Sequence, residues 1–320
     1  MRVHRLLLTW MALAVLAAHA QTYPTRPVRL VVGFETGGNT DTVARVVGQK
    51  LAERLGQQVV VENKTGASGT IGTGEAARAA PNGYTLTMGT TTTHAIAPAA
   101  YSKLTYDPVA DFEPIAMVAI APYMLVVNPS FPAKDLKEFV SVVKAQPGKF
   151  NYGSAGQATT THLVMATFAS KAGLDMVHIP FKGNAPATTA VLGNQVEILF
   201  GALPPLITLV NAGKVRALAI SSGKRSVSAP DVPTVAESGF PGFDMALWLG
   251  FFAPKGTPAA IIKRLEADLL HVARSPELKA ALEKQGLEAF PLGSAELASL
   301  LRSDVDTYKG VFKAANIPVQ

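Results

Sequence analysis

Short apolar segments alternate with amphipathic helical segments along most of this chain. The run 28–34 is largely apolar, and the segment 41–55 that follows carries Val43, Val47 and Leu51 at helical spacing. A strand that returns through a helix to the next strand predicts a parallel sheet covered by helices. The same alternation predicts strands at 58–62, 84–89, 149–154, 176–181, 196–200 and 215–221, and helices at 72–80, 133–145, 160–172, 185–193 and 204–212.

The end of the chain is predicted to be helical and to have no sheet of its own. Thr257-Pro258 is expected to start a helix over 258–274, and Ser275-Pro276 a helix over 276–285. Ser294 is expected to cap a last helix that runs to about Asn316. These helices need apolar surface to cover, and the sheet of the N-terminal half is the natural one.

About 300 residues follow the first twenty, which is more than one core usually supports, so two domains are the default expectation. We expect an α/β protein of two lobes, each a mostly parallel sheet flanked by helices. The first lobe would comprise residues 21–122 plus 248–320, and the second 123–247. Apolar segments near 118–125 and 245–252 would cross between the lobes as a two-strand hinge, with a ligand cleft between the lobes.

The first residues have the pattern of a secretory signal. Arg2 and Arg5 precede an apolar run over 6–17, and Ala18-His19-Ala20 is a cleavage signature, so residues 1–20 are predicted to be a signal peptide. Export with no cysteine for a lipid anchor predicts a periplasmic protein that diffuses freely. Loss of the two arginines lowers the formal charge from +6 to +4. The lysines and arginines are scattered, which argues against nucleic-acid binding.

The strongest local signal is a glycine-rich turn between the first strand and the first helix. Its residues can bring backbone amides close to a ligand, and the helix start adds unpaired N–H groups and a positive dipole end. Such a turn binds carboxylate or phosphate oxygens without a lysine, although an ordinary strand-to-helix turn has the same pattern. The candidate residues are Phe34, Glu35, Thr36, Gly37, Gly38, Asn39, Thr40 and Asp41.

Two later segments repeat the design. In the segment 152–162, a strand end, small residues and hydroxyls precede a helix, which makes Ser154, Ala155, Gly156, Thr159 and Thr160 candidates for binding the other end of an acid. Thr90 and Thr91 follow another strand and would lie at the same sheet edge as the first turn. The alternative for both segments is that the hydroxyls only cap helices.

Neither a metal site nor an active site is indicated. His94, His162 and His178 lack ligand spacing, and no G-x-S-x-G window occurs. We therefore expect no metal, no cofactor and no enzymatic activity.

The glycine-rich loops and several other segments of the chain resemble the substrate-binding proteins of tripartite tricarboxylate transporters, the Bug family. The resemblance covers the whole chain after residue 20. It rests on ordered matches at 23–29, 37–41 with Ala44-Arg45, 59–63, 66–69, 80–86, 106–112, 147–154, 180–183 (Pro-Phe-Lys182-Gly), 218–220 and 231–237.

The resemblance implies a type II-like periplasmic binding protein that closes over a small carboxylate. It also implies that the loops 33–41 and 154–160 bind carboxylate groups, with integral-membrane transporter subunits as partners. We expect the receptor itself to be a monomer. A sensory partner of another system would have the same fold, and an exported enzyme is the more distant alternative.

The sequence departs from the family pattern at two points. Glu35 stands in a loop that usually reads P-F-x-P-G-G, and it adds a negative charge where an anion is expected. Phe200-Gly201-Ala202 replaces the acidic residue that usually ends its strand. Gly201 therefore suggests a less polar pocket, which would suit an aromatic or aliphatic acid better than an amino acid.

Overall fold

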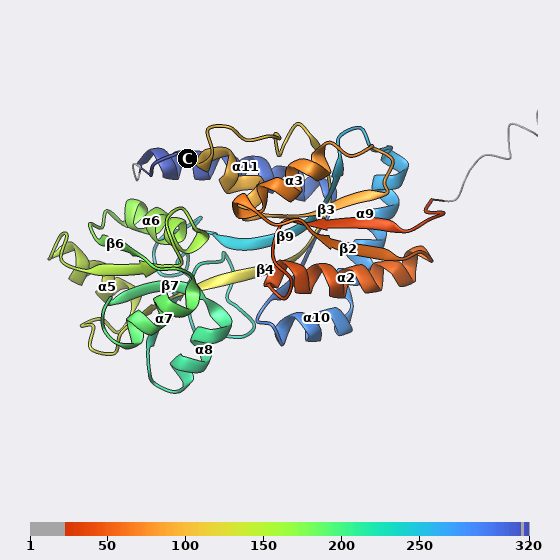
Figure 1. The fold of residues 1–320 in the computed structure, drawn as a ribbon. Helices are drawn as coiled ribbons and strands as arrows, with labels where there is room; N and C mark the ends of the chain where they lie inside the picture. Colours follow the sequence, from red (N-terminus) through yellow and green to blue (C-terminus); the bar gives the residue numbers. More distant parts are fainter. Residues whose placement is uncertain (1–22, 315–316, 320) are drawn as a thin grey trace, which may run out of the picture.

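One long strand joins the two halves of this molecule. In the computed structural model, which describes residues 23–314 and 317–319, β4 (Phe112–Val127) pairs with strands of two different sheets. The first sheet has the order β2-β1-β3-β9-β4-β10, and the second has the order β6-β5-β7-β4-β8. Figure 1 shows the two lobes side by side with β4 and β9 running between them. The predicted signal peptide lies outside the described residues.

The first lobe is built from both ends of the chain. Its N-terminal elements are β1 (Val28–Val32), α2 (Asn39–Leu55), β2 (Val59–Asn63), the short helix η2 (Ala67–Gly69), α3 (Thr70–Ala77), β3 (Thr85–Thr90), the π-helix η3 (Thr91–Ile96) and α4 (Ala97–Ala100). Its C-terminal elements are β9 (Ala246–Pro254), α9 (Ala259–Arg274), α10 (Pro276–Glu283), β10 (Glu288–Leu292) and α11 (Ser294–Ala314).

The second lobe lies between the two crossing strands in the sequence. It contains α5 (Leu136–Lys144), β5 (Asn151–Ser154), α6 (Thr160–Ala172), β6 (Val177–Pro180), α7 (Asn184–Leu192), β7 (Ile198–Ala202), α8 (Leu203–Asn211) and β8 (Arg216–Ile220). The expected alternation of strand and helix is therefore confirmed in both lobes. The exact lobe boundaries stay a prediction, since α11 also packs against α6 of the second lobe.

The sheets are mixed, where the sequence predicted mostly parallel ones. The outer strands are parallel as expected, with β1 between β2 and β3 and β5 between β6 and β7. The crossing strand β9 is antiparallel to both β3 and β4, and β4 is antiparallel to β7, β8 and β10. The reason is that β9 returns to the first lobe in the opposite direction to β4, so the two can pair only antiparallel.

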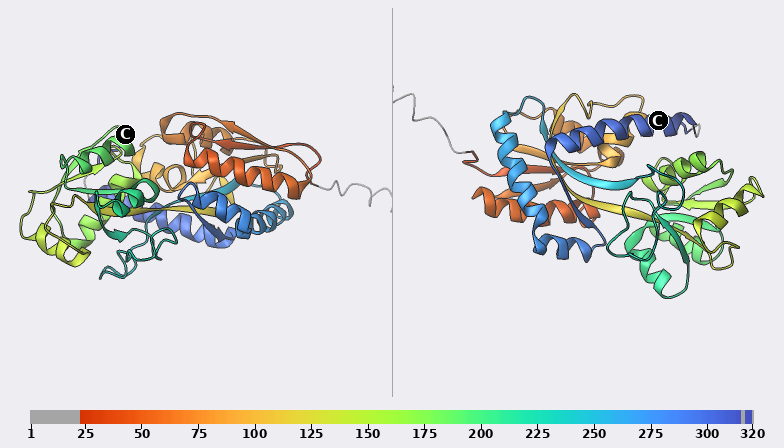
Figure 2. Two further views of the ribbon diagram at one scale, coloured as in Figure 1. Left: turned by 90° about the horizontal axis from the view of Figure 1, so that it is seen from below. Right: turned by 180° about the vertical axis from the view of Figure 1, so that it is seen from behind.

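Helices cover both faces of the first sheet (Figure 2). Alternate residues of β1 show this arrangement, because Leu30 packs into the core under α2, α9 and α10, while Val31 packs into the core under α3 and α11. Within the described part of the chain, no helix is long and apolar enough to cross a membrane.

Two details differ from the sequence prediction at the C-terminal end. Ser275 caps α10 as expected, because its hydroxyl accepts a hydrogen bond from the Leu278 N–H. Thr257 does not cap α9, since its hydroxyl donates to the Pro254 carbonyl and the N-cap residue is Pro258. The strand β10 was not predicted, because a run of only five partly buried residues carries little periodic signal.

A buried carboxylate ties α2 to α9. Asp268 is 2% exposed and accepts hydrogen bonds from Arg54 Nε at 2.7 Å and from Arg264 Nε at 2.6 Å. Burial raises the pKa of Asp268, but the hydrogen bonds and charges of Arg264 and Arg54 outweigh it, so the net pKa is lowered. The carboxylate therefore stabilises the fold in its ionised form.

We expect Asp268→Asn to lower the free energy of unfolding by about 1.5–3 kcal/mol at neutral pH, the range for hydrogen bonds to charged groups. Because the folded pKa is lowered, the wild type should lose this stabilisation as the pH falls below the ordinary aspartate value of about 4, and the difference between the proteins should shrink there. Urea unfolding at several pH values measures both. The control is Glu53→Gln, which removes an exposed ion pair with Lys50 and should change stability by less than about 0.5 kcal/mol. An equal loss in both variants would contradict the assignment.

Candidate functional site

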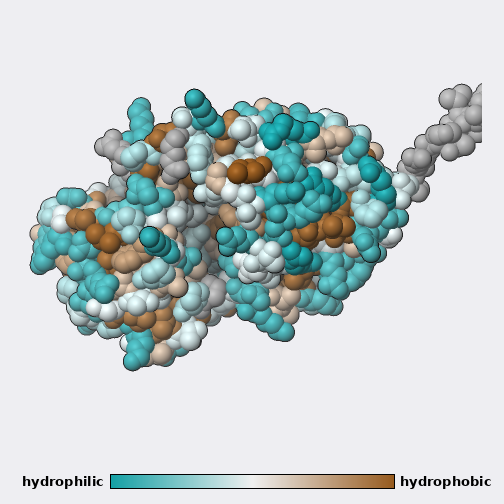
Figure 3. All heavy atoms as spheres, in the orientation of Figure 1, coloured by the Kyte–Doolittle hydropathy of each residue, from teal (hydrophilic) through white to brown (hydrophobic). Residues whose placement is uncertain are grey.

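The strand registers bring the candidate loops to one gap between the lobes. In the first sheet, Thr90 at the end of β3 pairs with Leu249, close to where Ala246 pairs with Pro122 at the crossing point. In the second sheet, Ala202 at the end of β7 pairs with Tyr123. The C-terminal ends of β1 and β3 therefore point at those of β5 and β7 across the crossing strands. Figure 3 shows the surface hollowed between the two lobes.

A network of hydrogen bonds around Asp41 orders the first loop. The Asp41 carboxylate accepts from the Gly37 N–H at 2.8 Å, from Asn63 Nδ2 at 2.9 Å and from Arg45. Burial raises the pKa of Asp41, yet hydrogen bonds from Arg45, Gly37 and Asn63 give a net lowering. Asn63 also donates to the Phe34 carbonyl. Asp41 is thus buried and hydrogen-bonded within the protein, where it holds the loop in place.

The same loop leaves the start of α2 open. Gly38 is the N-cap residue, and in the part of the chain that the structure describes no side chain caps this helix. Residues 35–39 are exposed, including Glu35. Gly33 allows close approach of the neighbouring loop, since a Cβ there would lie 2.5 Å from the Gly69 carbonyl oxygen. The result is a cavity of about 680 Å³ lined by residues 33–40, 65–66 and 68–69.

The second loop has the same backbone design. Ala158 has a positive φ of 56°, as Gly37 has a φ of 85°, and its N–H donates to His162 Nδ1 four residues on, as that of Gly37 donates to Asp41. The N-cap residue Thr159 has φ −75° and ψ 161°, close to the −75° and 168° of Gly38. Again the start of the helix, α6, is without a side-chain cap among the described residues.

Two stacked histidines support this second loop. The rings of His162 and His178 stack nearly parallel, with 3.8 Å between their centroids and an interplanar angle of 4°. Burial lowers the pKa of each to about 4, with a further contribution to His162 from His178. Both rings are therefore neutral near pH 7, which lets His162 Nδ1 accept from Ala158. His178 Nε2 lies 2.6 Å from the hydroxyl oxygen of Ser154.

Several predicted hydroxyls are used within the protein. Ser154 is fully buried and bonded to His178 and Gly156, and Thr159 donates to the Gly156 carbonyl. Thr160 is buried and hydrogen-bonded to Tyr123 of the crossing strand. For the segment 152–162 the capping alternative thus fails in its usual form, since the hydroxyls order the loop and leave the helix start open. Ala155 and Gly156 are partly exposed, and exposed Lys182 stands beside Gly183, whose N–H donates to Ala155.

Thr90, Thr91 and Gly201 face other parts of the protein. Thr90 is fully buried and caps η3 through the Thr93 N–H. Thr91 is fully buried too, and its hydroxyl bonds to Ala246 and Trp248 of β9. A Cβ at Gly201 would lie 2.8 Å from Leu206 of α8. The side-chain direction at position 201 is thus toward α8, so its lack of an acidic group does not make the gap less polar.

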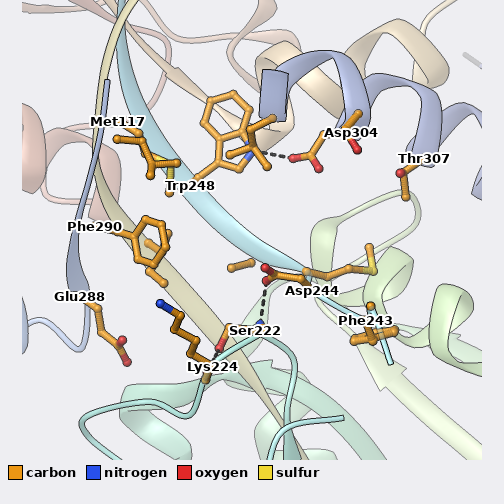
Figure 4. A pocket seen from close by; sticks show the side chains of 18 of the residues that line it. Met117, Ser222, Lys224, Phe243, Asp244, Trp248, Glu288, Phe290, Asp304 and Thr307 are labelled. Carbon is orange, nitrogen blue, oxygen red and sulfur yellow. Dashed lines mark hydrogen bonds between the residues drawn. The ribbon is translucent and has the colours of Figure 1, made fainter. Parts of the chain in front are cut away.

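A second, larger cavity lies on the other side of β4, and sequence reasoning missed it. It has a volume of about 740 Å³ and lies between α11, β10 and the loops that follow β8 (Figure 4). Its wall mixes apolar residues such as Trp248 and Phe290 with Lys224, Asp244 and Asp304. The Trp248 Nε1 donates to Asp304 at 2.7 Å, and burial, then the charge of Asp244, raises the pKa of Asp304 to about 6. In the described part of the chain, no cluster of His, Asp or Glu could hold a metal ion.

Comparison with known proteins agrees with this arrangement. The sequence model for the "Tripartite tricarboxylate transporter family receptor" matches residues 43–317. A ligand-free TctC solute-binding protein from Polaromonas is 30% identical, with a TM-score of 0.84, and the match covers 91% of this chain and 99% of that one. A protein from R. palustris with adipate is 32% identical, with a TM-score of 0.76 and coverage of 93% and 100%. MatC from Rhodopseudomonas palustris with bound malate is 34% identical, with a TM-score of 0.70 and coverage of 90% and 99%.

These matches confirm the resemblance and the fold drawn from the sequence. The family is one of transporter receptors, which bind solutes and do not turn them over. With its two lobes, crossing strands and open loops, the chain belongs to the tripartite tricarboxylate transporter receptor family.

Proposed function

We propose that this protein captures a small organic carboxylate between the loops 33–41 and 154–160. One observation carries the proposal: two helices from different lobes begin at the same gap with the same backbone geometry and without a side-chain cap. Each helix start offers unpaired N–H groups at the positive end of a helix dipole. Such groups bind carboxylate oxygens without a formal positive charge.

The ligand would bridge the lobes and stabilise a closed state. A ligand that binds both lobes at once shifts the population toward closure by its extra affinity for the closed form. The chain is more similar in shape to the ligand-free relative than to the two relatives that hold adipate or malate. This difference supports an open arrangement of the lobes here.

The charges of the gap favour a modestly charged acid. Glu35 is exposed on the first loop, and Lys182 is exposed beside the second. A carboxylate at the second loop would therefore lie near the cation of Lys182, whereas one at the first loop would lie near the amide dipoles of the helix start and the carboxylate of Glu35. Dicarboxylates such as those in the relatives are the first class to test. A bound acid would then pass to membrane subunits of a transporter, from a monomeric receptor that reaches the periplasm once residues 1–20 are removed.

A thermal-shift screen of the mature protein against dicarboxylic, tricarboxylic, aromatic and amino acids tests this proposal. A compound that binds only the folded state raises the unfolding midpoint with its concentration. We expect at least one carboxylate to do so, and matched amides to have no effect. No shift with any acid, for protein shown to be ligand-free, would contradict the proposal.

We expect Gly38→Val to abolish acid binding while the protein stays folded. Gly38 has a negative φ and a Cβ there would lie 3.5 Å from the Glu35 carbonyl, so valine fits the fold but covers the helix start. The matched control is Gly193→Val at the end of α7, where φ is −82° and the nearest atom is also a carbonyl oxygen 3.5 Å away. Calorimetry should show binding lost in the first variant only. Unchanged affinity in Gly38→Val would remove this loop from the site.

Acid affinity should also depend on the two histidines. Because the pKa of each is lowered to about 4, the folded loop favours the neutral rings, and its stability falls as the pH drops from about 6.5 toward 4. We expect acid affinity to fall over that range by more than the ligand's own protonation explains. His162→Asn places a non-titrating acceptor near the Nδ1 position and should weaken this pH dependence. Identical pH profiles by calorimetry would show that His162 plays no part.

A further inference from the structure

One hydrogen-bonded contact joins the lobes behind the hinge. Glu288 belongs to β10, which pairs with β4 in the first sheet. Its carboxylate accepts hydrogen bonds from the Ser226 hydroxyl and from the Val227 N–H, both in the loop that follows β8 of the second lobe. Ser226 is buried, and its oxygen also accepts from the Ser228 N–H, so the loop is held in place for this contact.

This contact lies on the opposite face of the two crossing strands from the proposed acid site. In the first sheet, β9, β3 and β1 lie on one side of β4 and β10 lies on the other. In the second sheet, β7 and β5 lie on one side and β8 on the other. The cavity of about 740 Å³ is lined by both crossing strands, by β10 and by residues 222–225 that follow β8, and none of its lining residues also lines the cavity at the loop 33–41. Seen from below in the left view of Figure 2, α2, which begins at the loop 33–41, lies on one side of the molecule, and the segment that follows β8 lies on the other.

Two buried hydroxyls fix where the lobes can turn. The Thr91 hydroxyl accepts from the Trp248 N–H at 2.9 Å and donates to the Ala246 carbonyl at 3.1 Å. The Ser221 hydroxyl accepts from the Tyr123 N–H at 2.9 Å and donates to the Met245 carbonyl. At the point where the two sheets separate, the hydroxyls of Thr91 and Ser221, one from each lobe, thus take the place of a neighbouring strand as hydrogen-bond partners of the crossing strands. Rotation is thereby confined to the crossing strands near residues 121–123 and 245–248.

Rotation about this line must open one side as it closes the other. When the loops 33–41 and 154–160 approach each other, the walls of the rear cavity separate, and Ser226 and Val227 are drawn away from Glu288. Figure 4 shows Glu288 and Lys224 on facing parts of that cavity, one from β10 and one from the second lobe. The open state therefore has a charged hydrogen-bonded contact that the closed state lacks.

We propose that Glu288 is a positioning residue that holds the lobes open and so sets the affinity for the acid. The inference rests on the proposed function for its effect on affinity, but its effect on the lobe angle needs no ligand. When only a small fraction of a receptor is in the closed state that binds the ligand, its apparent affinity is reduced in proportion to that fraction. We call the contact of Glu288 with Ser226 and Val227 the latch. Removing the latch raises the closed fraction, and the affinity for the acid rises with it.

The chain has no cysteine, so a pair of introduced cysteines can be labelled without background. Gln49→Cys in α2 and Ala185→Cys in α7 are exposed and lie in different lobes. Pulsed electron resonance between spin labels at these sites, without ligand, reports the lobe separation. We expect Glu288→Ala to shift the distances toward shorter values. By calorimetry it should bind the best acid from the screen about tenfold more tightly, since hydrogen bonds to a charged group are lost only from the open state.

Glu237→Ala is the matched control. The Glu237 carboxylate also accepts from a side chain, Arg225, and from a backbone N–H, that of Thr234, but all three residues lie in the second lobe. It should change neither the distances nor the affinity. Ser226→Ala is a milder second variant that should act in the same direction as Glu288→Ala, and it serves if the latter does not fold.

The outcomes separate the two proposals. Unchanged distances and unchanged or weaker affinity in the folded latch variants would overturn the role of Glu288, whatever the acid. Shorter distances with no acid bound by the wild type would support the latch and overturn the proposed function. Equal effects of Glu237→Ala and Glu288→Ala would reduce the latch to a general effect on stability and overturn it.

Discussion

The pairing of β4 with strands of both sheets is the constraint on which the structure depends. Because a single strand of 16 residues belongs to two sheets, the lobes are joined through backbone hydrogen bonds rather than through a loose linker. The second crossing strand, β9, pairs antiparallel with the first and limits the motion to rotation. The strand ends of each lobe must then face each other, so any loop that follows β1 or β5 faces the gap.

The two facing loops show how different side chains can produce one backbone geometry. An aspartate orders the first and a histidine the second, and each accepts a hydrogen bond from the N–H four residues before it. Most of the polar side chains that were predicted to contact the ligand form hydrogen bonds that order these loops instead. What remains open at the gap is backbone N–H, which has little preference among carboxylates. Selectivity therefore depends on groups around the loops, such as Glu35 and Lys182, and on how far the lobes close.

The equilibrium between open and closed lobes links the front of the molecule to its back. The acid would stabilise the closed state from the front, while Glu288 stabilises the open state from behind. Because Glu288 is far from the candidate loops in the strand order, it can set affinity without touching the ligand. The last helix, α11, contacts both β4 and α6 and adds a further connection between the lobes.

The sequence by itself determined the strand and helix order, the two crossing segments and the two loops at the lobe gap. These follow from periodicity and from glycine and hydroxyl residues at strand ends, which are local properties. Only the tertiary structure decided where the side chains point: Thr91 into the hinge, Ser154 onto His178, and position 201 toward α8. It also decided the mixed strand directions, β10 and the contact of Glu288 with Ser226. Each of these depends on residues distant in sequence that meet only on folding, and no local pattern encodes such pairs.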